Sequence, residues 1–329
     1  MKTDWNIAGS IMKYAGLFAK ICCLLFFIAI PATSDEAKPN ELGKIPILEY
    51  HLIQPDKSVW ARTAGEFRQD LELLYSSGYR SISLSDYIQG KIDIPAGTHP
   101  VIFTFDDSSP GQFRYLVRNG KKEIDPDCAV GIFIEFKKRH HDFGMHATFF
   151  VLTGATEPHK LFGQPEYESD KLKELVSLGF EIGNHTLWHA QLNKYSADIV
   201  IYQLATAVKN IQAILPGYNV HTLALPHGIY PKDINLAVEG TYRGTAYHND
   251  AILRVSGGPA PSPFNSRWDP WHLPRIQAGI NVQRMVNEFK KHPDEVFIND
   301  GKPDTVTYPS ALKSELNPSR FKTLRYVSY

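Results

Sequence analysis

Cysteine is scarce in this sequence: only three occur among 329 residues, and Cys22 and Cys23 lie in an apolar run near the N-terminus. Once that run is set aside, Cys128 has no partner for an internal disulfide, which excludes a small domain held by disulfide staples. Stability must therefore come from a hydrophobic core. With 43% hydrophobic residues, the chain can form one large domain, including an α/β barrel of about 250 residues.

An excess of either charge is also missing, because 35 Lys and Arg residues balance 35 Asp and Glu residues. A neutral chain with this hydrophobic content is not a disordered tail. It also has no basic stripe for nucleic acid and no polybasic segment that would hold the folded chain on acidic lipid. The composition predicts a globular protein with a neutral partner and no binding of nucleic acid.

Long hydrophobic runs are absent apart from residues 21–30, which follow three lysines. This run is about half as long as the ~20 residues that a spanning helix needs. Lysines, a short apolar core and the small residues after it are typical of a secretory signal, which we predict at residues 1–34. An uncleaved anchor that starts near Tyr14 stays open. We therefore expect a periplasmic, cell-envelope or extracellular protein, with membrane contact only through this segment if it is uncleaved.

Short β-type runs alternate with helical periodicity after a polar linker at residues 35–43. The alternation predicts an α/β fold with a single catalytic domain at residues 44–329, and seven strand–helix steps suggest a barrel. The clearest helix starts at a capping box formed by Thr63 and Glu66. A polar excursion is expected at 108–125. The predicted strands are 46–53, 81–84, 101–105, 147–152, 180–183, 222–225 and 244–247, and further helices are 169–179, 196–217 (with Ile199, Leu204, Val208 and Ile211 facing inward) and one that follows Asn281.

Two adjacent carboxylates, Asp106 and Asp107, directly follow the predicted buried strand 101–105. Active sites in α/β folds lie at the carboxyl ends of strands, so this pair is a candidate for acid–base or metal chemistry. A plain turn is the alternative interpretation, because Asp-Asp-Ser-Ser-Pro is favourable turn sequence.

Two imidazoles, His185 and His189, follow the predicted strand 180–183. Side chains four residues apart on a helical turn converge, and together with a carboxylate they can hold one divalent metal ion. Two polar histidines at a helix start are the alternative. A zinc-protease helix is excluded because Thr186 stands where that motif needs its glutamate base. One aspartate of the pair would then bind the metal while the other takes a proton from water.

TFDD at residues 104–107 and HTLWH at residues 185–189 resemble the first two motifs of the NodB-like polysaccharide deacetylases, carbohydrate esterase family four. The resemblance extends from about residue 44 to residue 276 through PILEYH, ATFFV, LGFEIGNHT, LPHG and LPRI. It implies a distorted (β/α)7 barrel and metal-dependent removal of N-acetyl groups from amino-sugar polymers. Residue by residue, the family's metal ligands match Asp107, His185 and His189, and its catalytic base matches Asp106.

The sequence departs from the family pattern at ALPHG, residues 224–228, which lacks the arginine that orients the base. Arg275 is a candidate substitute, although a structural pair between Arg275 and Asp269 is an equal alternative. No terminal Leu-x-His motif follows Ile276 to supply the acid. PILEYH instead resembles the opening strand of the circularly permuted poly-N-acetylglucosamine deacetylase branch, and this resemblance points to His51 as the acid.

The resemblance also suggests how the substrate is held. The backbone N–H of His227 matches a second donor to the oxyanion. Apart from the resemblance, the large aromatic residues Trp271, Trp188 and Trp268 could wall the acetyl pocket or stack on sugar rings, with a place in the core as the alternative. One divalent metal ion is implied as the cofactor. Two imidazoles with one carboxylate favour zinc, while cobalt, nickel and iron stay open.

The expected partner is an N-acetylated polysaccharide, and peptidoglycan, poly-N-acetylglucosamine and chitin-like chains all present the same acetamide. Two other functions stay open. A metal-dependent hydrolase of a small amide or cyclic imide would use a similar pocket, but export argues against it. A catalytically silent glycan-binding protein would explain the missing arginine of the third motif, but the intact Asp-Asp and His-His pairs argue otherwise.

Overall fold

The structure is a computed structural model that describes residues 38–56 and 58–329. The predicted signal segment, residues 1–34, lies outside the described residues. Within the described ranges, no helix combines the length and the apolar content that crossing a membrane requires.

The central sheet has eight parallel strands: seven follow the spatial order β16, β2, β6, β9, β10, β11 and β14, and β5 (Tyr79–Ser81) pairs with the start of β6. Leu253 at the end of β14 pairs in parallel with Leu273, just before β16, so that the two ends of the sheet meet. The predicted distorted (β/α)7 barrel is therefore confirmed. The strands are β2 (Ile47–Tyr50), β6 (His99–Phe105), β9 (Thr148–Val151), β10 (Glu181–Asn184), β11 (Thr222–Ala224), β14 (Ala251–Leu253) and β16 (Ile276–Gln277).

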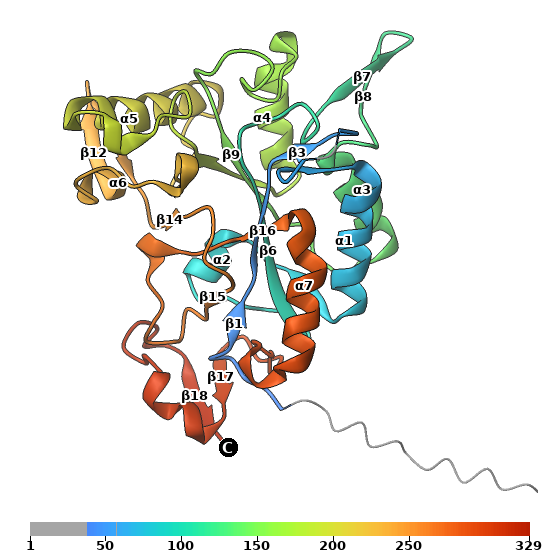
Figure 1. The fold of residues 1–329 in the computed structure, drawn as a ribbon, viewed down its shortest axis with the longest axis vertical. Coiled ribbons are helices and arrows are strands. Elements are labelled where there is room, and N and C mark those ends of the chain that lie inside the picture. The colour runs from blue at the N-terminus through green and yellow to red at the C-terminus, as the bar shows by residue number, and fades with distance from the viewer. Residues whose placement is uncertain (1–37, 57) are drawn as a thin grey trace, which may run out of the picture. The chain divides into compact units, whose positions relative to one another are not determined.

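Helices cover the outside of the barrel, and α1, α3 and α7 lie side by side on one flank (Figure 1). The predicted capping box of α1 is present: the Thr63 hydroxyl accepts the Glu66 N–H at 3.1 Å, and the Thr63 N–H donates to the Glu66 carboxylate at 2.9 Å. The helices are α1 (Ala64–Ser76), α2 (Leu84–Ile88), α3 (Ala129–Arg139), α4 (Glu168–Ser177), α5 (Ala197–Ile214), α6 (Asn235–Val238) and α7 (Ala278–Lys291).

Shorter elements connect the main strands and helices. The short strands are β1 (Lys44–Ile45), β3 (Leu52–Ile53), β4 (Ala61–Arg62), β5 (Tyr79–Ser81), β7 (Tyr115–Arg118), β8 (Lys121–Ile124), β12 (Glu239–Tyr242), β13 (Thr245–His248), β15 (Ala260–Pro261), β17 (Thr305–Tyr308) and β18 (Arg325–Ser328). The 3-10 turns are η1 (Pro165–Tyr167), η2 (Leu192–Lys194), η3 (Pro226–Gly228), η4 (Pro270–His272), η5 (Pro293–Glu295) and η6 (Ser310–Glu315).

Strand alternation sorts the side chains of β2 and β6 between the two faces of the barrel wall. On β6, Phe103 and Phe105 pack into the core that includes α1 and α3, whereas Ile102 packs into the other core cluster. On β2, Leu48 packs into the same core as Phe103, and Ile47 packs into the same cluster as Ile102. Because side chains two residues apart share a face, even positions of β6 and odd positions of β2 face the barrel interior.

One predicted barrel strand, residues 244–247, is wrong. That segment lies in β13, which pairs antiparallel with β12 outside the barrel, across a turn in which Arg243 and Gly244 both have positive φ. The barrel strand is β14, whose three residues are fully buried. A buried strand this short has no alternating pattern by which the sequence could identify it.

Two further expectations need correction. Ile199 of α5 was expected to face inward but is 37% exposed, and Val200 takes the buried position instead. The predicted polar excursion at 108–125 contains an antiparallel hairpin, β7 and β8, whose outer residues are exposed. The inward positions of Leu204, Val208 and Ile211 are confirmed.

The described part of the predicted linker packs against the C-terminal segment. Asn40, Glu41 and Leu42 are each about 3% exposed or less, and Asn40 pairs with Ile298. The Glu41 carboxylate accepts the backbone N–H of Thr307 in β17. Burial raises the pKa of Glu41 to about 8, although the Thr307 N–H opposes this.

We expect Glu41→Gln to flatten the pH dependence of stability. The folded protein holds the Glu41 proton up to about pH 8, whereas an ordinary glutamate loses it near 4.5, so the free energy of unfolding falls as pH rises through this window. At pH 9 relative to pH 5, the wild-type loss should exceed that of the variant by roughly 2–4 kcal/mol. Urea unfolding at both pH values measures the difference, and parallel curves for the two proteins would contradict it.

Candidate metal centre and catalytic site

Three predicted metal ligands converge at the carboxyl ends of β6 and β10, two barrel strands separated by β9. The Asp107 Oδ1 atom lies 3.2 Å from His185 Nε2 and 3.4 Å from His189 Nε2. His185 is 1% exposed, whereas His189 and Asp107 are half-buried. The three side chains can therefore reach one shared point at the rim of the barrel.

A tight turn after β6 points the two adjacent aspartates in different directions. Asp107 and Ser108 have φ of 71° and 50°, a left-handed conformation that Asp tolerates better than most residues. The Ser108 hydroxyl accepts the Leu152 N–H at 2.8 Å, and the Gln112 amide donates to the carbonyls of His51 and Asp106. These bonds fix Asp106 inside the barrel and Asp107 on its rim.

The two histidines converge through a turn rather than the predicted helical turn. Residues 185–190 follow β10 without forming a helix, and Thr186 and His189 have positive φ. The Thr186 N–H donates to the Asn184 side chain at 2.8 Å, and the buried Gln203 side chain accepts the Leu187 N–H at 3.1 Å. Side chains of β10 and α5 thus shape this turn, which is why spacing alone gave the wrong local conformation.

The arrangement fits a divalent metal ion. His185 Nδ1 lies 2.8 Å from the Ala224 carbonyl, which orients the ring and leaves Nε2 with a free lone pair. That Nε2 atom and Asp107 Oδ1 are buried without a hydrogen-bond partner among the described residues. Ligand atoms of a tetrahedral site, each about 2.0–2.2 Å from the ion, lie ~3.3–3.6 Å apart, close to the distances seen here.

The electrostatics of Asp107 and His189 favour their metal-ligand forms. Burial alone would raise the pKa of Asp107, but the close contact with His185 and the nearby imidazoles outweigh it and hold the pKa well below its usual range. Burial and the charge of His185 lower the pKa of His189 to about 4, so His189 is neutral at neutral pH. A carboxylate and a neutral imidazole are the forms that bind metal.

Arg275 holds Asp106 in the barrel interior. Arg275 Nη1 donates to Asp106 Oδ1 at 2.8 Å, and Nη2 donates to Oδ2 at 2.7 Å, a bidentate pair with no solvent exposure at Arg275. Nη1 also donates to the Thr104 hydroxyl at 3.1 Å. Burial would raise the pKa of Asp106, but the charges of Arg275 and His185 outweigh it and lower the pKa.

The alternative pair of Asp269 with Arg275 does not form. Asp269 is on the surface, where its carboxylate accepts the Trp271 N–H at 2.9 Å and contacts His272 Nδ1 at 2.8 Å. Asp269 therefore caps η4 instead of neutralising the buried arginine.

Glu49 is a site residue that the sequence reasoning missed. It is 1% exposed on β2, and its Oε1 atom lies 2.7 Å from Arg275 Nη2. Burial first, and then the charge of Asp106, raise the pKa of Glu49 well above its usual value, against the effect of Arg275. A second carboxyl group thus shares the interior cluster of Asp106 and Arg275.

His51 lies beside this cluster at the end of β2. Its ligand atom is within 4.8 Å of those of Glu49 and Asp106, and its ring lies 4.7 Å from the half-exposed ring of Trp60, measured between centroids. Burial lowers the pKa of His51, while the charges of Asp106 and Asp107 oppose the shift. His51 and Asp106 therefore flank the same space at the barrel rim.

The other predicted substrate residues are less closely grouped. The His227 ring lies 4.6 Å from that of His189, and the His227 backbone is left-handed, with φ of 59°. Trp188 and Trp271 are exposed, and the Trp271 carbonyl accepts the Tyr230 hydroxyl at 2.7 Å. The prediction that Trp268 walls the acetyl pocket is wrong, because this side chain is buried in the core, where its indole N–H donates to the Tyr87 hydroxyl at 2.8 Å.

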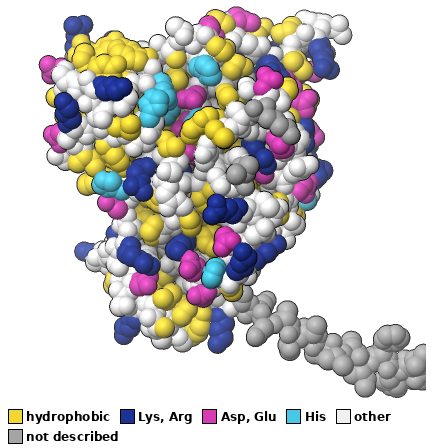
Figure 2. Space-filling model, viewed as in Figure 1, with side chains coloured by type: hydrophobic (Ala, Val, Ile, Leu, Met, Phe, Trp, Pro, Cys, Tyr) yellow, Lys and Arg dark blue, Asp and Glu magenta, His cyan; other side chains and the backbone are white. Residues whose placement is uncertain are grey.

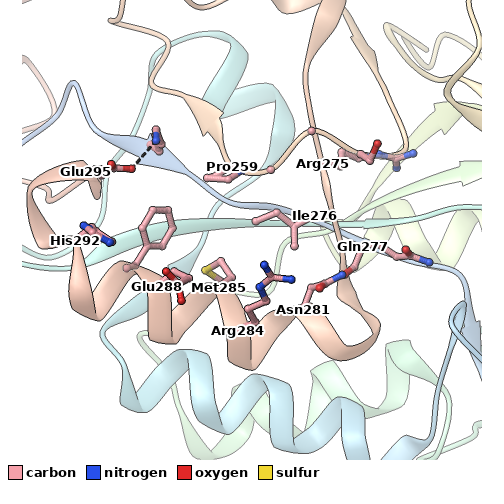
Figure 3. Close-up of a pocket in the computed structure, with 15 residues that line it drawn as sticks. Pro259, Arg275, Ile276, Gln277, Asn281, Arg284, Met285, Glu288, His292 and Glu295 are labelled. Carbon is pink, nitrogen blue, oxygen red and sulfur yellow. Dashed lines mark hydrogen bonds and ion pairs between the residues drawn. The ribbon is translucent and has the colours of Figure 1, made fainter.

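A separate cavity of about 490 Å³ lies between α7 and the loop at residues 256–259 (Figure 3). Met285 and Arg284 of α7 line it, and the Arg275 side chain points away from them. None of the three predicted metal ligands lines this cavity. On the face seen in Figure 2, acidic and basic side chains are interspersed without a continuous area of one sign.

Residues 135–243 match the family model described as "Polysaccharide deacetylase", a stretch that includes the two histidines and the ALPHG segment. A curated Bacillus subtilis protein, "Putative polysaccharide deacetylase YxkH", is 25% identical over 162 residues, which are 49% of this chain and 49% of that protein. The chain thus aligns with about half the length of this curated relative.

Solved structures share the fold. The Streptococcus pyogenes deacetylase PplD in complex with acetate aligns with 76% of this chain and 98% of its own, at 20% identity and a TM-score of 0.53. IcaB from Ammonifex degensii aligns with 75% of this chain and 97% of its own, at 18% identity and a TM-score of 0.53. Over residues 135–243 the chain thus matches the polysaccharide deacetylase family, and its barrel, with the NodB-like motifs gathered at the rim, has the fold of these solved structures.

Proposed function

We propose that the protein hydrolyses N-acetyl groups from an N-acetylated amino-sugar polysaccharide in a metal-dependent reaction. The observation that carries this proposal is the buried Asp106, held ionised by Arg275 beside the set of Asp107, His185 and His189. This arrangement supplies a base next to a metal site, which is what hydrolysis of an unactivated amide requires. A silent glycan-binding protein would have no need of a base beside a metal site.

One divalent ion would be held by Asp107, His185 and His189, and two imidazoles with one carboxylate favour zinc over cobalt, nickel or iron. When bound, the ion supplies Lewis acidity toward the attacking water and the acetamide carbonyl. The unpartnered Nε2 of His185 and Oδ1 of Asp107 support this assignment.

The protein side chains would move the protons. Asp106 accepts a proton from the attacking water as the new carbon–oxygen bond forms, and Arg275 keeps Asp106 oriented. The backbone N–H of His227 stabilises the oxyanion. Protonated His51 donates to the departing nitrogen as the carbon–nitrogen bond breaks, which yields acetate and a free amine. Trp271 would contact the sugar.

The polymer substrate and the location follow from the same proposal. Residues 44–329 would form the catalytic domain, and the N-terminal segment would export it to the periplasm, the cell envelope or the outside of the cell. N-acetylated cell-wall and matrix polymers occur there, and poly-N-acetylglucosamine, peptidoglycan and chitin-like chains are the candidates.

Acetate release tests the proposed function. Protein without residues 1–34, reconstituted with zinc, is incubated with poly-N-acetylglucosamine, chitooligosaccharides and peptidoglycan, with a chelator-treated control. Acetate that disappears on chelation and returns with metal supports the proposal. No acetate from any polymer despite a full metal site would overturn it, and turnover of a small cyclic imide would then identify the alternative hydrolase.

We expect His51→Ala to lower kcat by about 10²–10⁴-fold without loss of bound metal, because the leaving nitrogen loses its proton donor. Acetate release and metal content by elemental analysis measure the two effects. His248→Ala, at an exposed position away from the site, serves as the control. A wild-type kcat in the His51 variant would refute the acid assignment.

A further inference from the structure

Glu49 is a buried carboxyl group that the proposed mechanism does not use. Neither of its carboxyl oxygens has a regular hydrogen bond among the described residues, although the side chain is 1% exposed. Nearly all buried polar groups in native proteins have partners, so such an exception calls for an explanation. A buried carboxyl group without a regular hydrogen bond costs stability relative to an apolar side chain.

Four hydrogen bonds engage most of the Arg275 guanidinium. Nε donates to the Arg254 carbonyl at 2.7 Å, Nη1 donates to Thr104 and Asp106, and Nη2 donates to Asp106. A guanidinium has five N–H donors, so these bonds leave one N–H of Nη2. Glu49 Oε1 lies 2.7 Å from Nη2 as an ion pair, at an angle outside that of a regular hydrogen bond. Glu49 therefore lies against the last open donor of Arg275.

A second metal ion is the competing explanation for Glu49. The ligand atoms of Glu49, His51 and Asp106 lie within 4.8 Å of one another, a spacing that could suit a cation. Arg275 already provides a cation there, with Nη2 at 2.7 Å from both carboxyl groups. A divalent ion would face strong repulsion from this guanidinium in the barrel interior. The cluster is therefore a guanidinium site.

The charges in this cluster balance when Glu49 is uncharged. Burial and the neighbouring Asp106 raise the pKa of Glu49, whereas Arg275 lowers that of Asp106. One positive and one negative charge then share the closed interior, which avoids an uncompensated buried charge. A neutral carboxyl group still presents an acceptor oxygen to Arg275, and a glutamine side chain can present one as well.

We propose that Glu49 is a positioning residue, which holds the Arg275 guanidinium in the orientation that pairs with both oxygens of Asp106. Its effect on rate rests on the proposed function, whereas its contact with Arg275 does not. Because β2 lies between β6 and β16, Glu49 occupies the wall between the strand that carries Asp106 and the segment that carries Arg275. A guanidinium free to shift would misplace the base, and a displacement of about 1 Å can cost ~10²-fold in rate.

The kinetic test compares Glu49→Leu with Glu49→Gln. We expect the leucine variant to lose kcat by about ten- to a hundredfold, with KM within about twofold and full metal content, because it removes the acceptor but no substrate or metal contact. The glutamine variant should restore kcat to within about threefold of wild type. Glu41→Gln, at another buried glutamate whose carboxylate contacts Thr307 instead of Arg275, is the matched control. A wild-type kcat in the leucine variant, or a loss that follows metal content, overturns the proposal.

A double-mutant cycle tests whether Glu49 acts through Arg275. In an Arg275→Met background, Glu49→Leu should change kcat by less than about twofold, and the urea midpoints of the four proteins should be non-additive. The midpoints need no substrate. If wild type releases no acetate, the proposed function fails, yet non-additive midpoints still support the contact and additive midpoints overturn it.

Discussion

Asp106→Asn is expected to reduce kcat by about 10²–10⁴-fold while the protein keeps its metal and its KM. The amide has nearly the shape of the carboxylate and can still lie against Arg275, but it cannot accept a proton from water. Because Asp107, His185 and His189 are untouched, metal content by elemental analysis should equal that of wild type. Acetate release under saturating substrate measures the loss.

Asp70→Asn provides the matched control for this experiment. Asp70 is also buried, at 4% exposure, and is also paired with an arginine, Arg62, but it lies outside the metal centre. The control should lose stability and keep its kcat. A value of kcat for Asp106→Asn within tenfold of wild type would contradict the base assignment, and loss of metal in that variant would make Asp106 a ligand instead.

Arg275→Met should be the most destabilising substitution of those considered, with a loss of about 3–5 kcal/mol in the free energy of unfolding. It leaves Asp106 and Glu49 buried without their cation. Since the charge of Arg275 is the leading cause that keeps the pKa of Asp106 low, burial would dominate in the variant and protonate the base near neutral pH. We expect kcat at pH 7 to fall by about 10²-fold, with partial recovery as pH rises.

Urea unfolding and a pH–rate profile check these two effects separately. Arg62→Met, which breaks the comparable pair with Asp70, should lose stability without moving the acidic limb of the profile. An unchanged acidic limb in Arg275→Met would mean that the arginine does not set the protonation of Asp106. Unchanged stability would show that the variant rearranges to neutralise both carboxyl groups.

Much of the barrel and the metal set could be predicted from local patterns. The strand at 101–105 ends at two aspartates and the strand at 180–183 ends at a histidine pair, and parallel strands bring their carboxyl ends to one rim. The convergence of Asp107, His185 and His189 follows from this rule. The conformation of the histidine turn does not, because the side chain of Gln203 on α5, which follows the turn, holds the turn's backbone.

Glu49 shows what a closer use of the same patterns would add. In the predicted strand 46–53, residues 47, 49 and 51 share one face, so the choice of His51 for the barrel interior also places Glu49 there. A carboxyl group in that interior needs a cation, and Arg275 is near in space only because the barrel closes. The alternation of residues along the strand could thus place Glu49 in the interior, but it could not identify Arg275 as its partner.

The position of β2 in the sheet has a consequence for the order in which the site assembles. β2 is the first barrel strand in the chain, yet it pairs with β16, the last, and the contact of Glu49 with Arg275 spans almost the whole barrel sequence. During synthesis, Asp107, His185 and His189 emerge well before Arg275. The metal set can gather while Asp106 still lacks its guanidinium, and the pair of Asp106 with Arg275 forms only once the segment of β16, the last barrel strand, is in place.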